Sequence, residues 1–166
     1  ALSHSTDVDL EALTREHLLF GERISQRVGN RVCTAHSNDR NPERALRIGF
    51  VSADFRQHAV AKFFIPFMEA FGKRPEFICH AYYNHAARDM DTEAIERHFA
   101  VWHPVVGLSD ESLVAQIQED AIDILIDLSG HTAGNRLAMF ACQQFSKSVI
   151  FCFNKFEELA QNAHAA

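Results

Sequence analysis

Four short apolar runs alternate with segments of helical periodicity from residue 46 onward. The apolar runs have the length of β-strands and cover residues 46–52, 76–83, 101–106 and 122–128. The segments between them repeat apolar residues at helical spacing and cover residues 59–72, 89–100 and 109–121. Such alternation is typical of right-handed βαβ units, and the unbroken run "ILI" is typical of a parallel sheet covered on both faces. The sequence therefore predicts an α/β fold, a Rossmann-like parallel sheet with helices on both faces.

The segments on either side of this alternation predict the domain organisation. An amphipathic helix is expected before Gly29, because apolar residues recur there at near-helical spacing. A surface linker without periodicity follows, up to about residue 45. Near the other end, "SVIFCF" can add a fifth strand and "KFEELAQNAHA" a closing helix. We therefore expect three parts: a leading helix and linker (8–45), the Rossmann-like lobe (46–153) and a divergent C-terminal helix or tail (154–166).

Length, charge and cysteine usage narrow the class of protein. The 166 residues suffice for one ordinary domain, and a net charge of -6 argues against a phosphate-backbone partner. No apolar stretch reaches the ~20 residues of a membrane span, and no signal segment opens the chain. The four cysteines stand far apart, so we expect reduced thiols. These features predict a cytoplasmic protein that binds neither nucleic acid nor a membrane.

Two polar loops follow the first and fourth predicted strands. In the strand order 3-2-1-4, the direction in which strands are added reverses between strands 1 and 4, and ligands bind beyond the C-terminal ends at that point. The two loops read "SADFRQHA" and "SGHTAGN". We therefore expect both loops to open onto one crevice, with His58 and His131 on opposite sides.

Each loop allows a functional and a purely structural interpretation. Gly130 and Gly134 flank the second loop and Asn135 begins a short helix, so its backbone N–H groups either bind a phosphate or sugar or form a plain strand-to-helix turn. His58 either accepts a proton or hydrogen-bonds a sugar, or it caps the following helix. Asp127 either is desolvated with a perturbed pKa or caps its turn, and we favour the cap. The pattern by itself leaves the choice at the two loops open.

Two further patterns are interpreted as structural. The histidine pairs His80 with His85 and His98 with His103 lack the spacing of a zinc site, so no metal ligand is assigned. The phenylalanines at helical spacing in the segment 59–72 are expected to form core rather than a stacking platform. These are Phe63, Phe64, Phe67 and Phe71.

Several strings occur in the order and spacing of a known family. They are "LRIGFVSADFRQHAVAKFF", "VWHPVVGLSDESL" and "DILIDLSGHTAGNRLAMFA". Ahead of them stand "EHLLFGER" and "HSNDRNPERALRIGF", which are similar to the segment that joins tetratricopeptide repeats to the catalytic region in that family. Over about residues 10 to 141, the chain resembles the SPINDLY-like family of protein O-linked N-acetylglucosaminyltransferases.

This resemblance implies a two-lobed glycosyltransferase of the B-type fold, with the present chain as the N-terminal lobe. It implies transfer of GlcNAc from the donor UDP-GlcNAc to Ser or Thr hydroxyls of acceptor proteins, with inversion and without a metal or other cofactor. By the motif "DFRQH", His58 is the expected catalytic residue, as a base or as a group that positions sugar and acceptor. By "SGHTAGN", the predicted substrate-binding residues are Gly130, His131, Thr132, Gly134 and Asn135.

After Ala141 the chain departs from the family pattern, which continues into a second lobe that binds UDP. We expect this chain to be inactive alone, because the residues that hold UDP and balance its leaving charge belong to that lobe. Its expected partners are the missing C-terminal lobe, tetratricopeptide repeats, the nucleotide-sugar and acceptor proteins. Two alternatives are a non-catalytic, truncated interaction module and a relative that transfers fucose instead of GlcNAc.

Overall fold

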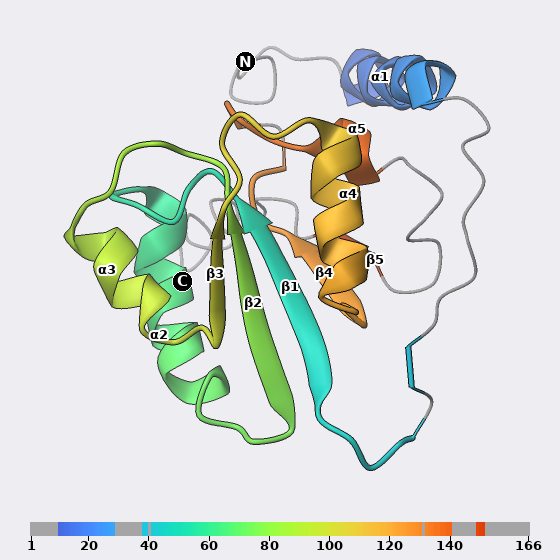
Figure 1. Ribbon diagram of the computed structural model, residues 1–166. Coiled ribbons are helices and arrows are strands. Elements are labelled where there is room, and N and C mark those ends of the chain that lie inside the picture. Colours follow the sequence, from blue (N-terminus) through green and yellow to red (C-terminus); the bar gives the residue numbers. More distant parts are fainter. Residues whose placement is uncertain (1–9, 29–37, 40, 131, 141–148, 152–166) are drawn as a thin grey trace.

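A computed structural model shows a five-stranded parallel sheet with the strand order β3-β2-β1-β4-β5 (Figure 1). The structure describes residues 10–28, 38–39, 41–130, 132–140 and 149–151. The strands are β1 (Leu46–Ser52), β2 (Phe77–Tyr83), β3 (Val101–Pro104), β4 (Ile124–Asp127) and β5 (Val149–Phe151). The expected order 3-2-1-4 is confirmed, and β5 extends it beyond β4. The predicted closing helix in 154–166 lies outside the described residues.

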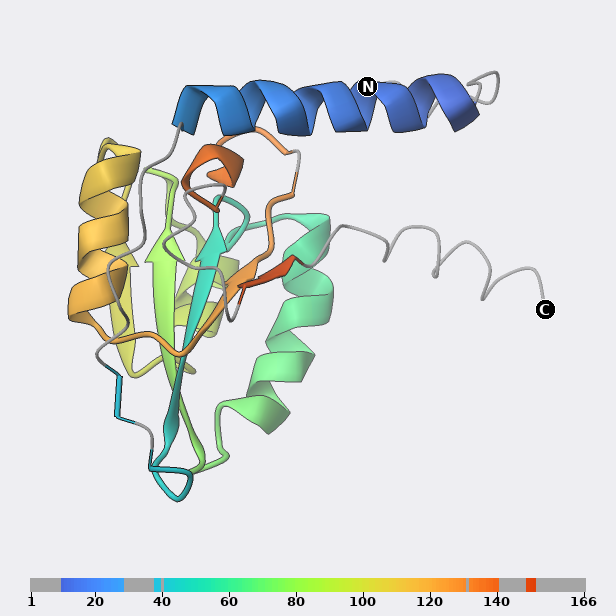
Figure 2. The same cartoon turned by 90° about the vertical axis from the view of Figure 1, so that its right-hand side faces the viewer.

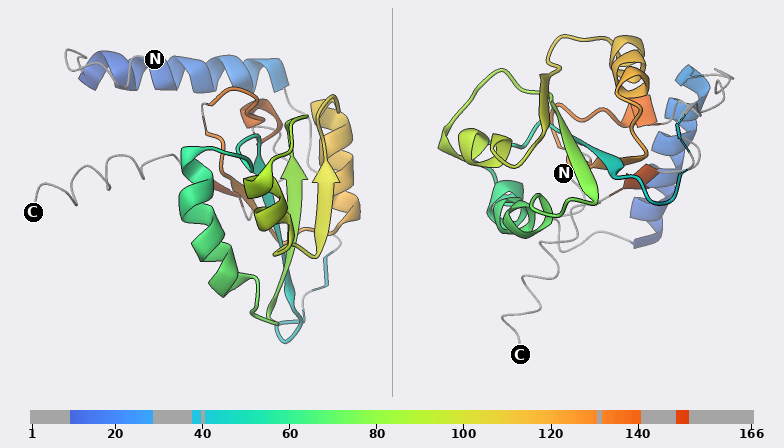
Figure 3. Two further views of the ribbon diagram at one scale, coloured as in Figure 1. Left: turned by 90° about the vertical axis from the view of Figure 1, so that its left-hand side faces the viewer. Right: turned by 60° about the horizontal axis from the view of Figure 1, so that its bottom comes forward.

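Helices cover both faces of the sheet, which confirms the predicted Rossmann-like fold (Figures 1 and 3). Helices α2 and α3 pack together on one face, and α4 covers the other; α1 lies across the C-terminal edge of the strands, next to α5 (Figure 2). They are α1 (Leu10–Val28), α2 (Ala59–Phe71), α3 (Met90–Glu96), α4 (Asp110–Glu119) and α5 (Leu137–Phe140). No helix in the described ranges is long and apolar enough to cross a membrane.

The central strand β1 sends alternate side chains into two separate cores. Ile48 and Phe50 pack beneath α2, whereas Val51 packs with the buried face of α4. Gly49 faces the second core, where an added Cβ would lie 2.8 Å from Leu125 Cδ1. A larger residue at position 49 would therefore displace the side chains of Leu125, Tyr82 and Ile122.

An aromatic cluster anchors the loop that follows β1. Phe55 is fully buried there, and its ring centroid lies 5.2 Å from that of Phe64 and 5.6 Å from that of Trp102. Ring pairs at such separations add to the stability gained from burial alone. The loop thus holds its position by inserting a side chain into the core under α2.

The expectation that all four phenylalanines of α2 form core is wrong for two of them. Phe64 is buried, but Phe63 and Phe67 are 50% and 46% exposed. Residues 61, 64 and 68 face the sheet, and a helix of this pitch turns positions 63 and 67 to its flank. The distortion expected at Pro66 does not end the helix, because α2 continues to Phe71.

Asp123 fastens the segment before β1 to the start of β4. Its carboxylate accepts two hydrogen bonds from Arg44, at 2.5 and 2.6 Å, and further bonds from the Asn38 side chain and the Arg47 backbone. Burial opposes ionisation here, but these donors outweigh it and lower the pKa of Asp123 to about 2. The linker residues nearest the sheet are therefore held by a charged, multiply bonded contact.

We expect Phe55→Ala to lower the free energy of unfolding by about 3–5 kcal/mol, because it empties a fully buried aromatic site. Met90→Ala is the control, since Met90 is 85% exposed and its truncation should cost less than about 0.5 kcal/mol. Urea unfolding of both variants measures the difference. A loss below about 1 kcal/mol for Phe55→Ala would show that the loop is not anchored through this ring.

Candidate functional site

The loops after β1 and β4 are bonded to each other at the point where the strand order reverses. The backbone N–H of Ala53 donates to Ser129 Oγ at 2.9 Å, and Leu128 N–H donates to the Val51 carbonyl at 3.0 Å. Thr132 Oγ1 donates to Asp54 Oδ2 at 2.8 Å. The two loops that the sequence assigned to one crevice therefore form one bonded unit at the C-terminal edge of the sheet.

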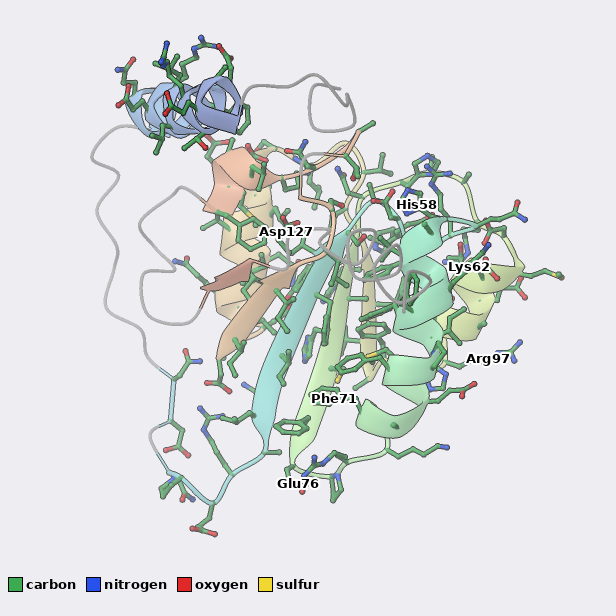
Figure 4. The ribbon with its side chains drawn as sticks, turned by 180° about the vertical axis from the view of Figure 1, so that it is seen from behind. His58, Lys62, Phe71, Glu76, Arg97 and Asp127 are labelled. Carbon is green, nitrogen blue, oxygen red and sulfur yellow. The ribbon has the colours of Figure 1, made fainter. Side chains whose placement is uncertain are left out.

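His58 stands at this edge as the N-cap of α2. Its Nδ1 accepts a hydrogen bond from Val60 N–H at 3.3 Å and lies 4.0 Å from Asp54 Oδ2. The imidazole is 30% exposed, so its other face reaches solvent. Figure 4 shows labelled His58 and Asp127 at the same end of the sheet. The capping interpretation of His58 therefore holds, and no described residue hydrogen-bonds the outer nitrogen of the ring.

Asp54 and Asp127 place two buried carboxyl groups beneath the loops. Asp127 accepts hydrogen bonds from the backbone N–H groups of Ser129, at 3.1 Å, and Gly130, at 2.9 Å. Burial nevertheless raises the pKa of Asp127 to about 6, and the negative charge of Asp54 adds to the rise. Both interpretations of Asp127 are therefore correct: it caps the turn, and it is a desolvated carboxyl group.

Several backbone N–H groups of the loop after β4 are bonded within the loop. Thr132 N–H donates to the Ser129 carbonyl and Asn135 N–H to the Thr132 carbonyl. The Asn135 side chain donates to the Thr132 carbonyl and accepts from Leu137 N–H. Together with Gly130 N–H, which Asp127 accepts, these donors close the turn instead of pointing to a phosphate. Thr132 and Asn135 are half-buried, and Gly134 is exposed.

The loop approaches its neighbours most closely at Gly134. This residue has φ +81°, and an added Cβ would lie 3.0 Å from Ala53 Cβ. Its carbonyl accepts a hydrogen bond from Asn84 Nδ2 at 2.7 Å. Glycine is needed here both for the left-handed backbone and for the close contact between the loops.

Arg136 links the loops that follow β2, β3 and β4. It donates to Asp110 Oδ1 and Asn84 Oδ1, both at 2.9 Å, and to the Val105 carbonyl at 3.0 Å. Arg136, Asn84 and Asp110 were not among the residues predicted from the sequence. Position in the chain could have identified Asn84, because it directly follows β2 and so lies at the same edge of the sheet as the two loops. His131, the remaining predicted site residue, lies outside the described residues.

The sequence matches a known enzyme family. The family model described as "Glycosyl transferase family 41" matches residues 2–151. The chain belongs to glycosyltransferase family 41. The family resemblance carried by the three strings is thereby confirmed, and so is the expected enzyme class.

Similar proteins support the assignment of this chain to family 41. Two plant proteins carry the name "Probable UDP-N-acetylglucosamine--peptide N-acetylglucosaminyltransferase SPINDLY". The one from Petunia hybrida is 34% identical over 110 residues, which are 64% of this chain and 12% of that protein. The one from Arabidopsis thaliana is 31% identical over 114 residues, again 12% of its length. The chain therefore spans about an eighth of these relatives.

A solved structure has the same fold. A mutant O-GlcNAc transferase from Thermobaculum terrenum superposes with a TM-score of 0.70 at 32% identity, over 84% of this family 41 chain and 26% of that chain. The sheet with helices on both faces thus corresponds to part of a glycosyltransferase. The predicted part boundaries at residues 45 and 153 stay predictions.

Gly134→Ala should destabilise the chain more than Gly107→Ala, by about 1 kcal/mol or more. Both glycines have φ near +80°, so both variants cost about 1–2 kcal/mol of backbone strain. Only the Cβ at position 134 meets another atom, whereas nothing lies within 4 Å of one at position 107. Urea unfolding gives the difference, and equal losses would contradict the close approach of the two loops.

The pKa of Asp127 predicts a stability that falls as pH rises. Between pH 4 and 6 the folded state holds a proton that the unfolded state releases, so up to about 3 kcal/mol is lost across this window. Asp127→Asn has no proton to lose there, and its stability relative to wild type should rise with pH. Urea unfolding of both proteins at several pH values measures this, and parallel pH curves would contradict the raised pKa.

Proposed function

We propose that this chain forms one lobe of a protein O-linked N-acetylglucosaminyltransferase. The complete enzyme transfers GlcNAc from UDP-GlcNAc to Ser or Thr hydroxyls of acceptor proteins, without a metal or other cofactor. The observation that carries the proposal is the pair of hydrogen-bonded loops where the strand order reverses between β1 and β4, with the partly exposed ring of His58 beside them. The names of the plant relatives and of the Thermobaculum terrenum enzyme support the same reaction.

The hydrogen bond at Nδ1 favours a donor role for His58. A neutral imidazole that accepts from Val60 N–H at Nδ1 carries its proton on Nε2. This outer nitrogen therefore donates a hydrogen bond and has no lone pair to take the proton of an incoming hydroxyl. Of the two roles that the resemblance implies, the geometry supports the group that positions sugar and acceptor.

The remaining predicted substrate residues are Gly130, His131, Thr132, Gly134 and Asn135. The N–H groups of Gly130, Thr132 and Asn135 are bonded within the turn, so we expect these residues to contact the sugar through the surface of the turn rather than through those N–H groups. Transfer needs the UDP-binding lobe as a partner, because the leaving diphosphate requires charge stabilisation. The isolated chain is expected to be inactive for this reason.

Addition of a C-terminal lobe, taken from the Thermobaculum terrenum enzyme, tests this function. We expect the mixture to transfer GlcNAc to an acceptor peptide, measured by mass spectrometry, and the chain alone to transfer none. His58→Ala should lower kcat by roughly 10²-fold or more, and His58→Asn, which keeps a side-chain N–H donor, should lower it less. His98→Ala is the control outside the site.

Three outcomes distinguish the possible roles of His58 and of the chain. Unchanged kcat in His58→Ala would remove His58 from the reaction. Equal loss in His58→Ala and His58→Asn, with loss of one limb of the pH–rate profile, would assign the proton-accepting role instead. If the mixture of the two lobes transfers neither GlcNAc nor fucose from a nucleotide-linked donor, the interaction module is the function that the results support.

An interaction module is a second candidate because α1 presents apolar side chains to solvent. Leu18 is 66% exposed, and Leu19 and Phe20 are each 37% exposed. Titration of the 15N-labelled chain with UDP-GlcNAc distinguishes the two functions. Shifts confined to residues 52–61 and 129–135 support the enzyme lobe, whereas a well-dispersed spectrum without shifts supports the module.

A further inference from the structure

Two histidines and an aspartate converge on the face of the sheet covered by α4. His80 lies in β2, His103 lies in β3, and Asp120 follows the last turn of α4. Asp120 Oδ2 is 2.9 Å from His103 Nε2 and 3.8 Å from His80 Nδ1. One donor atom from each residue falls within a group whose members all lie within 4.8 Å of one another.

One ring nitrogen in this cluster is not satisfied by the described residues. Nδ1 of His80 is buried and has no hydrogen-bond partner among them, whereas Nε2 of His103 lies in ion-pair contact with Asp120 Oδ2 at 2.9 Å. His80 itself is only 6% exposed. A buried polar atom without a partner is costly, so its retention points to a ligand that the ring nitrogens can bind.

Neighbouring side chains hold the three residues in place. Tyr82 Oη donates to Asp120 Oδ2 at 2.6 Å, and Gln116 Nε2 donates to Asp120 Oδ1 at 3.3 Å. The ring of Tyr82 also stacks on that of His103, with centroids 5.2 Å apart and planes inclined by 14°. Hydrogen bonds that orient a ligating carboxylate, and contacts that fix an imidazole, are the usual supports of a metal site.

We propose that His80, His103 and Asp120 form a three-ligand binding site for a zinc-like divalent transition-metal ion. Two imidazoles and one carboxylate suit such an ion, and a water completes the tetrahedron. Bonds of ~2.0–2.1 Å place tetrahedral ligand atoms about 3.3 Å apart, so the distances to Asp120 Oδ2 need change by only about half an ångström. The side chain of His103 is 24% exposed, which provides the route for ion and water.

The site is separate from the loops that carry the proposed transfer. Its ligands come from the α4 face of β2 and β3 and from the C-terminal end of α4, whereas His58 lies at the start of α2. A bound ion would fasten the end of α4 to the edge of the sheet formed by β2 and β3. Its role is therefore to stabilise the lobe, and it does not depend on the reaction proposed above.

The first experiment titrates the full 166-residue chain, freed of metal with a chelator, with Co²⁺ and then Zn²⁺. We expect one Co²⁺ per chain with the intense visible absorption of tetrahedral coordination, displaced by Zn²⁺. At a Zn²⁺ concentration about 100 times Kd, Tm should rise by roughly 5–10 °C.

Variants of the ligands decide whether the ion binds here. Tyr82→Phe removes a hydrogen bond to a ligand and should weaken Co²⁺ binding by roughly 10–100-fold. His103→Gln and Asp120→Asn each remove a ligand and should weaken Co²⁺ binding by more than that. His98→Gln, a half-buried histidine outside the cluster, should bind as the wild type does. Far-UV circular dichroism confirms that each variant is folded.

The proposal is overturned if the folded wild type takes up no Co²⁺. It is also overturned if His103→Gln binds Co²⁺ as tightly as wild type, because the ion would then sit on other histidines. A titration with UDP-GlcNAc in the presence of chelator keeps the two proposals distinguishable. Shifts at residues 52–61 should persist without metal, so failure of one proposal leaves the other standing.

Discussion

The contact between the loops after β1 and β4 is the constraint on which the candidate site depends. Ala53 N–H bonds to Ser129, Thr132 bonds to the buried carboxylate of Asp54, and Gly134 lies against Ala53. Parallel strands end at one edge of a sheet, and the reversal of strand order leaves space there for a ligand. Here the two loops are hydrogen-bonded to each other at this position, and the partly exposed imidazole of His58 lies beside them.

Burial beneath this contact brings two carboxyl groups close to each other. Asp127 accepts hydrogen bonds from two backbone N–H groups, and Asp54 accepts one from the Thr132 hydroxyl. Desolvation and the neighbouring charge of Asp54 nevertheless raise the pKa of Asp127. The hydrogen bonds of Asp127 therefore support the loop after β4, although the negative charge of this carboxylate is costly at neutral pH. Carboxyl groups with perturbed pKa values are common at functional sites, where the geometry of the site often lowers the stability of the fold.

Local pattern predicted most of the fold because each strand and helix carries its own periodicity. The strand order 3-2-1-4 was expected from the Rossmann-like alternation of strands and helices. Within β1, the alternation of side chains places Phe50 and Val51 in different cores. The phenylalanines of α2 were harder to place, because spacing alone does not say how wide a stripe the sheet covers. Phe64 reaches the core, while Phe63 and Phe67 lie on the flank.

The sequence by itself determined the α/β class, the family and the positions of the two polar loops, because these depend on periodicity and on strings of adjacent residues. Only the tertiary structure decided which groups meet: that His58 caps α2 through Nδ1, that Arg136 joins three loops, and that His80 and His103 converge on Asp120. Such contacts join residues far apart in the chain. Their geometry follows from how strands pair and helices pack, which no local spacing encodes.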